Sequence, residues 1–141
     1  MGWPSKTVSP QDLISSARKA LQKAYAPYSG FRVGAAILTT NNDVFVGCNV
    51  ENAVPGLTIC AERNAMTSLV QQSAGGDPVA IAVVGENGEE CPPCGSCRQF
   101  LFEFNPDMIV LLESSGEILT MTLRDLLPLP FMIPSERPFR E

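Results

Sequence analysis

The chain has 141 residues, a length typical of a single domain that can bury a hydrophobic core. Hydrophobic residues make up 45% and charged residues 18%, which is ordinary for a globular protein and argues against a largely disordered chain. The formal net charge is -5 and the basic residues form no cluster, which disfavours nucleic acid and anionic membranes as partners. A small neutral substrate fits this charge better.

Targeting signals and residue types narrow the possible chemistry further. No apolar stretch reaches the roughly 18 residues of a membrane span, and residues 1–11 lack the design of a signal peptide. We therefore expect a cytoplasmic protein. Five cysteines in such a chain favour reduced thiols with a metal-binding or catalytic role over a disulfide framework. The absence of histidine excludes mixed cysteine–histidine zinc sites, imidazole bases and Ser-His-Asp triads.

The first predicted element is a helix that begins after Ser9, an N-cap residue followed by Pro10 and an acidic first turn. Apolar residues then recur at helical spacing as far as Ala24, so one face should pack on a core. We expect the helix to end at Ala26, because Pro27 disfavours helical geometry in the residue before it.

A β-hairpin is predicted next, with strands over residues 31–40 and 44–50 joined by a short polar turn. Gly34, followed by two alanines inside the first strand, indicates close approach of a helix or a ligand. The second strand runs out in Asn49-Val50-Glu51-Asn52, which the spacing alone leaves open between a solvated strand end and a functional segment.

The middle of the chain predicts a helix, a central strand and another helix. The continuous apolar run over residues 79–84 is typical of a strand covered on both faces. The helices are expected over residues 59–72 and 94–104. In the first of them, the inward-facing residues should be Ala61, Ala65, Met66, Leu69 and Val70.

The last predicted strands cover residues 108–112 and 118–121, and their short link requires them to pair antiparallel. A capping box beginning at Thr122 opens a brief helix that Pro128 ends. We expect a single domain over residues 1–141, with its core at about residues 9–131 and a tail over residues 132–141.

Two short runs carry the candidate chemistry, Cys60-Ala61-Glu62-Arg63 and Pro93-Cys94-Gly95-Ser96-Cys97. A Cys-x-x-Cys pair with a third thiolate from another helix can hold one tetrahedral metal and leave a fourth position open. Positions i and i+2 do not share a helix face, so Cys60 and Glu62 can face one site only if Cys60 lies where the chain enters the helix.

Zinc held by three thiolates carries a net negative charge, which helix N-termini and a nearby arginine can neutralise. Arg63 and Arg98 both lie beside the motifs, and the charge argument favours Arg63. A water bound to zinc becomes a strong nucleophile near neutral pH. Glu62, the only acid within either motif, can accept its proton.

Cysteine ligands with a non-ligand glutamate form a pattern known from zinc deaminases. Three further segments, Phe31-Arg32-Val33-Gly34-Ala35-Ala36, Asn49-Val50-Glu51-Asn52-Ala53 and Leu126-Leu127-Pro128-Leu129-Pro130-Phe131, stand in the matching order and spacing. From about Tyr28 to Phe131 the chain closely resembles the short, homotetrameric cytidine deaminases. The resemblance implies an α/β fold, a three-layer α/β/α sandwich with a mixed five-stranded sheet.

The same resemblance implies Zn2+ held by Cys60, Cys94 and Cys97. Zinc hydroxide would attack C4 of cytidine or 2'-deoxycytidine, with Glu62 as the proton shuttle, to give ammonia and the uridine nucleoside of pyrimidine salvage. Active sites would be shared between the subunits of a homotetramer. The implied substrate-binding residues are Asn49 and Glu51 at the ribose, Phe31 near the pyrimidine, the backbone N–H of Ala61 at the base, and Phe131 in a neighbouring subunit's pocket.

Two features depart from the family pattern. Val54-Pro55-Gly56 stands where the family usually has an aromatic residue, in a loop that helps wall the nucleoside pocket. Cys91 extends the second motif to Cys91-x-x-Cys94-x-x-Cys97, which would also permit a closed four-thiolate site. The alternatives are therefore a deaminase of a modified nucleoside such as blasticidin S, a non-catalytic four-cysteine zinc module, and a redox protein using Cys94 and Cys97 as a dithiol.

Overall fold

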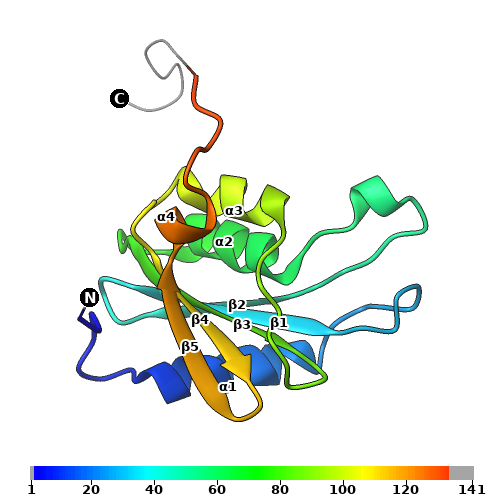
Figure 1. Ribbon diagram of the computed structural model, residues 1–141, viewed down its shortest axis with the longest axis horizontal. Helices are drawn as coiled ribbons and strands as arrows, with labels where there is room; N and C mark the ends of the chain where they lie inside the picture. The colour runs from blue at the N-terminus through cyan, green and yellow to red at the C-terminus, as the bar shows by residue number, and fades with distance from the viewer. Residues whose placement is uncertain (1, 134–141) are drawn as a thin grey trace.

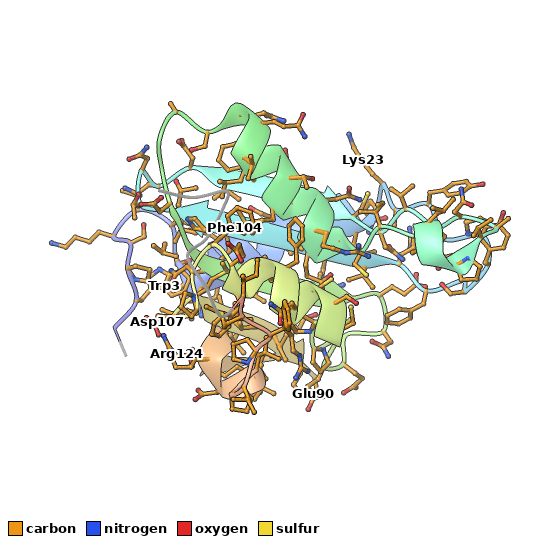
Figure 2. All side chains as sticks on the ribbon, turned by 90° about the horizontal axis from the view of Figure 1, so that it is seen from above. Trp3, Lys23, Glu90, Phe104, Asp107 and Arg124 are labelled. Atoms are coloured by element: carbon orange, nitrogen blue, oxygen red, sulfur yellow. The ribbon has the colours of Figure 1, made fainter. Side chains whose placement is uncertain are left out.

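The computed structural model describes residues 2–133, and a single mixed sheet divides them into three layers (Figure 1). Helix α1 covers one face of the sheet, and α2, α3 and α4 cover the other. Seen from above, α2, α3 and α4 lie side by side (Figure 2). The expected three-layer α/β arrangement is confirmed.

The sheet has five strands in the order β2-β1-β3-β4-β5. β1 pairs antiparallel with both β2 and β3, β3 pairs parallel with β4, and β4 pairs antiparallel with β5. The predicted hairpin, central strand and antiparallel last pair are all present. The strands are β1 (Val33–Thr39), β2 (Val44–Cys48), β3 (Pro78–Gly85), β4 (Ile109–Ser114) and β5 (Glu117–Thr122).

Short-range capping signals place the starts of the first and last helices correctly. Ser9 and Asp12 form a reciprocal capping box at the first helix, and Thr122 and Asp125 form another at the last. Pro55–Leu57 forms a 3-10 turn, η1, in the loop that departs from the family pattern. The α-helices are α1 (Pro10–Leu21), α2 (Ala61–Gln72), α3 (Gly95–Phe102) and α4 (Leu123–Leu126).

The predicted end of the first helix was wrong, because α1 stops at Leu21 and not at Ala26. The next three N–H groups donate to carbonyls three residues back, which tightens the last turn. Tyr25 then pairs with the end of the second strand, donating to Asn49 O at 3.0 Å. The pairing of Tyr25 with a distant strand thus accompanies the end of α1 several residues before Pro27, whose effect on helical geometry was the expected cause.

Two apolar clusters fill the spaces between the layers. One packs beneath α2 and α3, and the other lies between α1 and the opposite face of the sheet. Of the inward positions expected in the second helix, Ala61, Ala65, Met66 and Leu69 are buried. Val70 is 58% exposed, so that prediction was wrong: in the last turn only Leu69 reaches the core.

Glycines in the hairpin set how closely the helices approach the sheet. A Cβ on Gly34 would collide with the carbonyl of Ala17 and lie 2.8 Å from the amide nitrogen of Leu21, so α1 rests directly on β1. This confirms the predicted close approach. On the other face, a Cβ on Gly47 would lie 2.5 Å from the carbonyl oxygen of Ala61. β2 therefore holds the first turn of α2 by backbone contact. None of the helices within residues 2–133 has the length and apolar character to span a bilayer.

We expect Gly47→Ala to destabilise the protein by about 1–3 kcal/mol or more, because the added methyl meets the rigid backbone of α2. Urea unfolding followed by circular dichroism measures the change. Gly56→Ala is the matched control, since nothing lies within 4 Å of a Cβ there. Equal midpoints for the two variants would contradict the close approach of α2 to β2.

Candidate metal centre and active site

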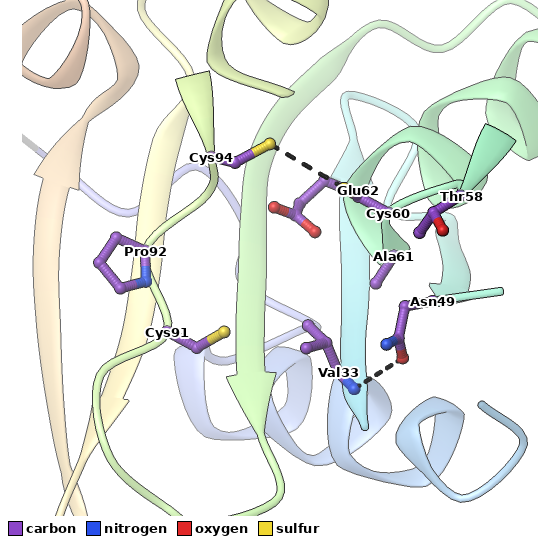
Figure 3. Close-up of a pocket in the computed structure, with 9 residues that line it drawn as sticks. All are labelled: Val33, Asn49, Thr58, Cys60, Ala61, Glu62, Cys91, Pro92 and Cys94. Atoms are coloured by element: carbon purple, nitrogen blue, oxygen red, sulfur yellow. Dashed lines mark hydrogen bonds between the residues drawn. The ribbon is translucent and has the colours of Figure 1, made fainter. Parts of the chain in front are cut away.

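Helix α2 places the first cysteine and the candidate acid at one point. Cys60 is the N-cap residue, with extended backbone angles of φ -70° and ψ 154°. Glu62 lies in the first turn and is 4% exposed. Because Cys60 stands outside the helical repeat, its side chain and that of Glu62 line the same pocket (Figure 3). The geometric condition that the sequence imposed is met.

Helix α3 supplies the other two sulfurs in the same way. Cys94 is its N-cap residue and Cys97 is buried in its first turn. The Sγ atoms of Cys60, Cys94 and Cys97 all lie within 4.8 Å of one another, with 3.9 Å between those of Cys60 and Cys94. Thiolates around one tetrahedral zinc, with Zn–S bonds of about 2.3 Å, stand roughly 3.8 Å apart. The cluster therefore fits a single zinc ion with three sulfur ligands and an open position.

Positive charge lies against this sulfur cluster. Arg63 Nη2 donates to Thr58 O at 3.1 Å and to Cys60 Sγ at 3.6 Å. Hydrogen bonds from Cys97 and from Arg63 lower the pKa of Cys60 to about 5. The shared hydrogen bond with Cys60, together with burial, raises the pKa of Cys97. The guanidinium of Arg63 thus lies where it favours the thiolate form of Cys60.

Glu62 is a buried carboxyl group at the edge of the cluster. Burial raises the pKa of Glu62 to about 7, and the negative charge of Cys60 adds to the shift. Figure 3 shows the carboxyl group of Glu62 pointing into the pocket, between the segments that carry Cys60 and Cys94. A group so placed can exchange a proton with a molecule bound in the pocket.

Cys91 does not join the metal cluster. Within residues 2–133, the sulfurs that come within 4.8 Å of one another are those of Cys60, Cys94 and Cys97. Cys91 instead lines the pocket beside Pro92, and burial raises the pKa of its thiol to about 11. The arrangement is that of an open three-thiolate site and not of the closed four-cysteine module. The residues lining the pocket are Val33, Asn49, Thr58, Cys60, Ala61, Glu62, Cys91, Pro92 and Cys94.

The two expected ribose residues already have partners within the chain. Asn49 lines the pocket, and its side chain accepts from Val33 N–H at 2.8 Å and donates to Phe31 O at 3.0 Å. The Glu51 carboxylate lies outside the pocket lining and accepts from the amides of Tyr28 and Ser29 at 2.9 and 3.0 Å. The Ser29 hydroxyl also donates to it and is the main cause of the lowered pKa of Glu51. A sugar is therefore not needed to satisfy these groups.

The two expected aromatic residues lie apart from the pocket lining of this subunit. Phe31 packs over Gly85, where a Cβ would lie 2.6 Å from its ring. Phe131 is 74% exposed on the segment that follows α4. Within this chain, the structure brings together the metal ligands, Glu62, Ala61 and Asn49, but not Phe31, Glu51 or Phe131.

Two residues after the second cysteine pair have contacts that sequence reasoning missed. The Gln99 amide grips the backbone of Phe131 at both ends, donating to its carbonyl at 2.9 Å and accepting from its N–H at 3.0 Å. Arg98 donates to Pro93 O and to Leu126 O, which joins the cysteine loop to the end of α4. The only sequence signal for these contacts was the position of Arg98 and Gln99 next to Cys97. Every residue has a backbone carbonyl, so the sequence does not show which carbonyl a side chain will bond.

Similarity to known proteins is high along most of the chain. The model of the cytidine and deoxycytidylate deaminase zinc-binding region matches residues 8–113. A cytidine deaminase from Halalkalibacterium halodurans is 44% identical over 120 residues, which cover 84% of this chain and 90% of that protein. The chain belongs to the cytidine and deoxycytidylate deaminase family. Its metal cofactor is Zn2+, and the cluster of Cys60, Cys94 and Cys97 is consistent with binding this ion.

Solved structures of the family agree with this fold. The crystal structure of cytidine deaminase from Burkholderia pseudomallei matches with a TM-score of 0.81 and 45% sequence identity, covering 87% of this chain and 99% of that one. A blasticidin-S deaminase from Bacillus cereus is more distant, at 29% identity over 133 residues, or 88% of this chain and 94% of that protein.

We expect Cys60→Ser, Cys94→Ser and Cys97→Ser each to lose most bound zinc, because each removes one of three close sulfur ligands. Cys91→Ser is the matched control and should keep zinc at one equivalent. Atomic absorption on the purified proteins gives the metal content. Loss of zinc from the Cys91 variant as well would favour the four-cysteine module.

Proposed function

We propose that this chain catalyses the hydrolytic deamination of cytidine and 2'-deoxycytidine to uridine and 2'-deoxyuridine, as an enzyme of pyrimidine salvage in the cytoplasm. The observation that carries the proposal is the buried carboxyl of Glu62 beside a three-sulfur cluster in one pocket. The kinship with proteins named cytidine deaminase supports the choice of substrate.

Cys60, Cys94 and Cys97 would hold the zinc ion. When bound there, zinc supplies the Lewis acidity that makes water a strong nucleophile near neutral pH. The negative charge of three thiolates would weaken that acidity if nothing offset it. Arg63, which donates to Cys60 Sγ, and the N-termini of α2 and α3 provide the compensating charge.

Glu62 would move the protons of the reaction. It accepts a proton from the attacking water as oxygen bonds to C4 of the pyrimidine, and it delivers that proton to N3. It then passes the second proton from the new hydroxyl to the exocyclic nitrogen. The C4–N bond breaks, ammonia leaves, and a C4 carbonyl remains. Burial of Glu62 keeps this carboxyl away from bulk water during both transfers.

The remaining pocket residues would orient the nucleoside. The backbone N–H of Ala61, in the first turn of α2, has no partner within the helix repeat and is proposed to donate to the base. Asn49 and Glu51 are proposed to bind the 3'-hydroxyl, with their orientations held by the backbone contacts of residues 28–33. Phe31 is proposed to lie near the pyrimidine.

Assembly would complete the site. We propose a homotetramer in which Phe131 of each chain enters a neighbour's pocket. The supporting observation is a run of exposed apolar side chains after α4, whose backbone is fastened by Gln99. The exposed residues are Leu129, Phe131, Met132 and Ile133.

We expect Glu62→Gln to keep zinc and to lower kcat for cytidine by at least about 100-fold, because the amide cannot carry a proton between water and N3. An ultraviolet assay of cytidine loss gives the rate, and atomic absorption gives the zinc content. Glu117→Gln is the control, since Glu117 is exposed at the start of β5, away from the pocket lining.

Normal turnover by the Glu62 variant would show that the proton carrier is misassigned. The same assay, run with blasticidin S, tests the second candidate substrate, which is suggested by the similarity to a blasticidin-S deaminase. Turnover of blasticidin S equal to or faster than that of cytidine would overturn the choice of an ordinary nucleoside.

Shared active sites predict complementation between two chains that are each impaired at a different site residue. Phe131→Ala should raise KM for cytidine about tenfold, the usual loss when an aromatic ring stacked on a base is removed. After subunit exchange with Glu62→Gln, hybrid assemblies should regain activity, because an intact Glu62 then meets a neighbour's Phe131. Sedimentation should give four times the 15.2 kDa chain mass. Absence of any gain on mixing would place Phe131 in its own subunit's site or outside catalysis.

A further inference from the structure

The pocket has two unlike sides, and the proposed reaction leaves Cys91 and Pro92, on one of them, without a role. Helix α2 and the strand end at Asn49 form one side, which carries Glu62 and Ala61. The loop before α3 forms the other and contributes Cys91 and Pro92 (Figure 3). The Cys91 thiol points across the pocket toward the α2 side.

The geometry of a pyrimidine ring decides which of its edges meets each side. N3 and C5 are the two ring neighbours of C4 and lie on opposite sides of it. If C4 is held at the open corner of the sulfur cluster, and N3 faces Glu62 on α2, the C5–C6 edge must face away from α2. That direction leads to the loop before α3.

The chemistry of that wall matches the edge it would meet. C5 and C6 of cytosine carry only hydrogen and offer no hydrogen-bonding group. The facing side chains of Cys91 and Pro92 are largely apolar, whereas the acid and the free helix N–H lie on the other side of the pocket. Cys91 is also packed against the core cluster under α2 and α3, so its side chain has little room to yield.

We propose that Cys91 and Pro92 form the subsite for C5 of the pyrimidine, and that the Cys91 side chain limits the size of a 5-substituent. The inference rests on the proposed function and names the substrate range of the same site. It makes Cys91 a specificity-determining residue for cytosine nucleosides, with unsubstituted cytosine preferred to 5-methylcytosine.

The test compares kcat/KM for cytidine and 5-methylcytidine in wild type, Cys91→Ala and Cys91→Leu. Cys91→Ala opens the wall and should raise the ratio of 5-methylcytidine to cytidine about tenfold, the scale for one methyl group in a pocket. Cys91→Leu fills the same space and should lower the ratio by a similar factor. Zinc content is measured in each protein.

Cys48→Ala is the matched control, because Cys48 is a half-buried cysteine of β2 outside the pocket lining. It should leave the ratio at the wild-type value. A ratio that changes less than twofold in both Cys91 variants, with zinc retained, would overturn the C5 subsite. If only one variant folds, the direction of its change decides. Failure of wild type to deaminate cytidine would instead overturn the proposed function itself.

Discussion

The site depends on the convergence of two helix N-termini on one face of the sheet. α2 and α3 each begin at a cysteine, and their first turns bring three sulfurs within 4.8 Å. Both helices present unpaired N–H groups and partial positive charge at this point. This partial charge would offset part of the mutual repulsion of three thiolates bound to one Zn2+.

Backbone contacts hold the two helices in this relation. Gly47 lets the first turn of α2 rest on β2 without an intervening side chain. On the other side, Arg98 ties the cysteine loop to the end of α4 through two carbonyl acceptors. The metal ligands are thus positioned by rigid elements on either flank, and the pocket between them takes its shape from the same contacts.

Local sequence patterns predicted much of this structure. The capping boxes at Ser9 and Thr122 marked true helix starts. The i, i+2 spacing of Cys60 and Glu62 required Cys60 to lie at the entrance to α2, where it is found. The failures arose where distant segments decide the outcome. The pairing of Tyr25 with the strand end at Asn49 shortened α1. No sequence pattern predicts that these two residues pair.

The candidate site also contains residues that the sequence predicts and contacts that it does not. Its sulfur ligands and acid follow from residue type and spacing, because zinc chemistry restricts both. The contacts of Asn49, Glu51 and Gln99 do not, since their partners are backbone groups available at almost every position. The sequence therefore shows that a polar side chain lies near a motif, but it does not identify the backbone group to which that side chain bonds.

The two-point grip of Gln99 on Phe131 ties the exposed aromatic arm to the helix that starts at a zinc ligand. Less than two helical turns separate Cys94 from Gln99, so the backbone of Phe131 is bonded to the same short helix that begins at the sulfur cluster. A shift of α3 would therefore move the cysteine pair and the Phe131 backbone together.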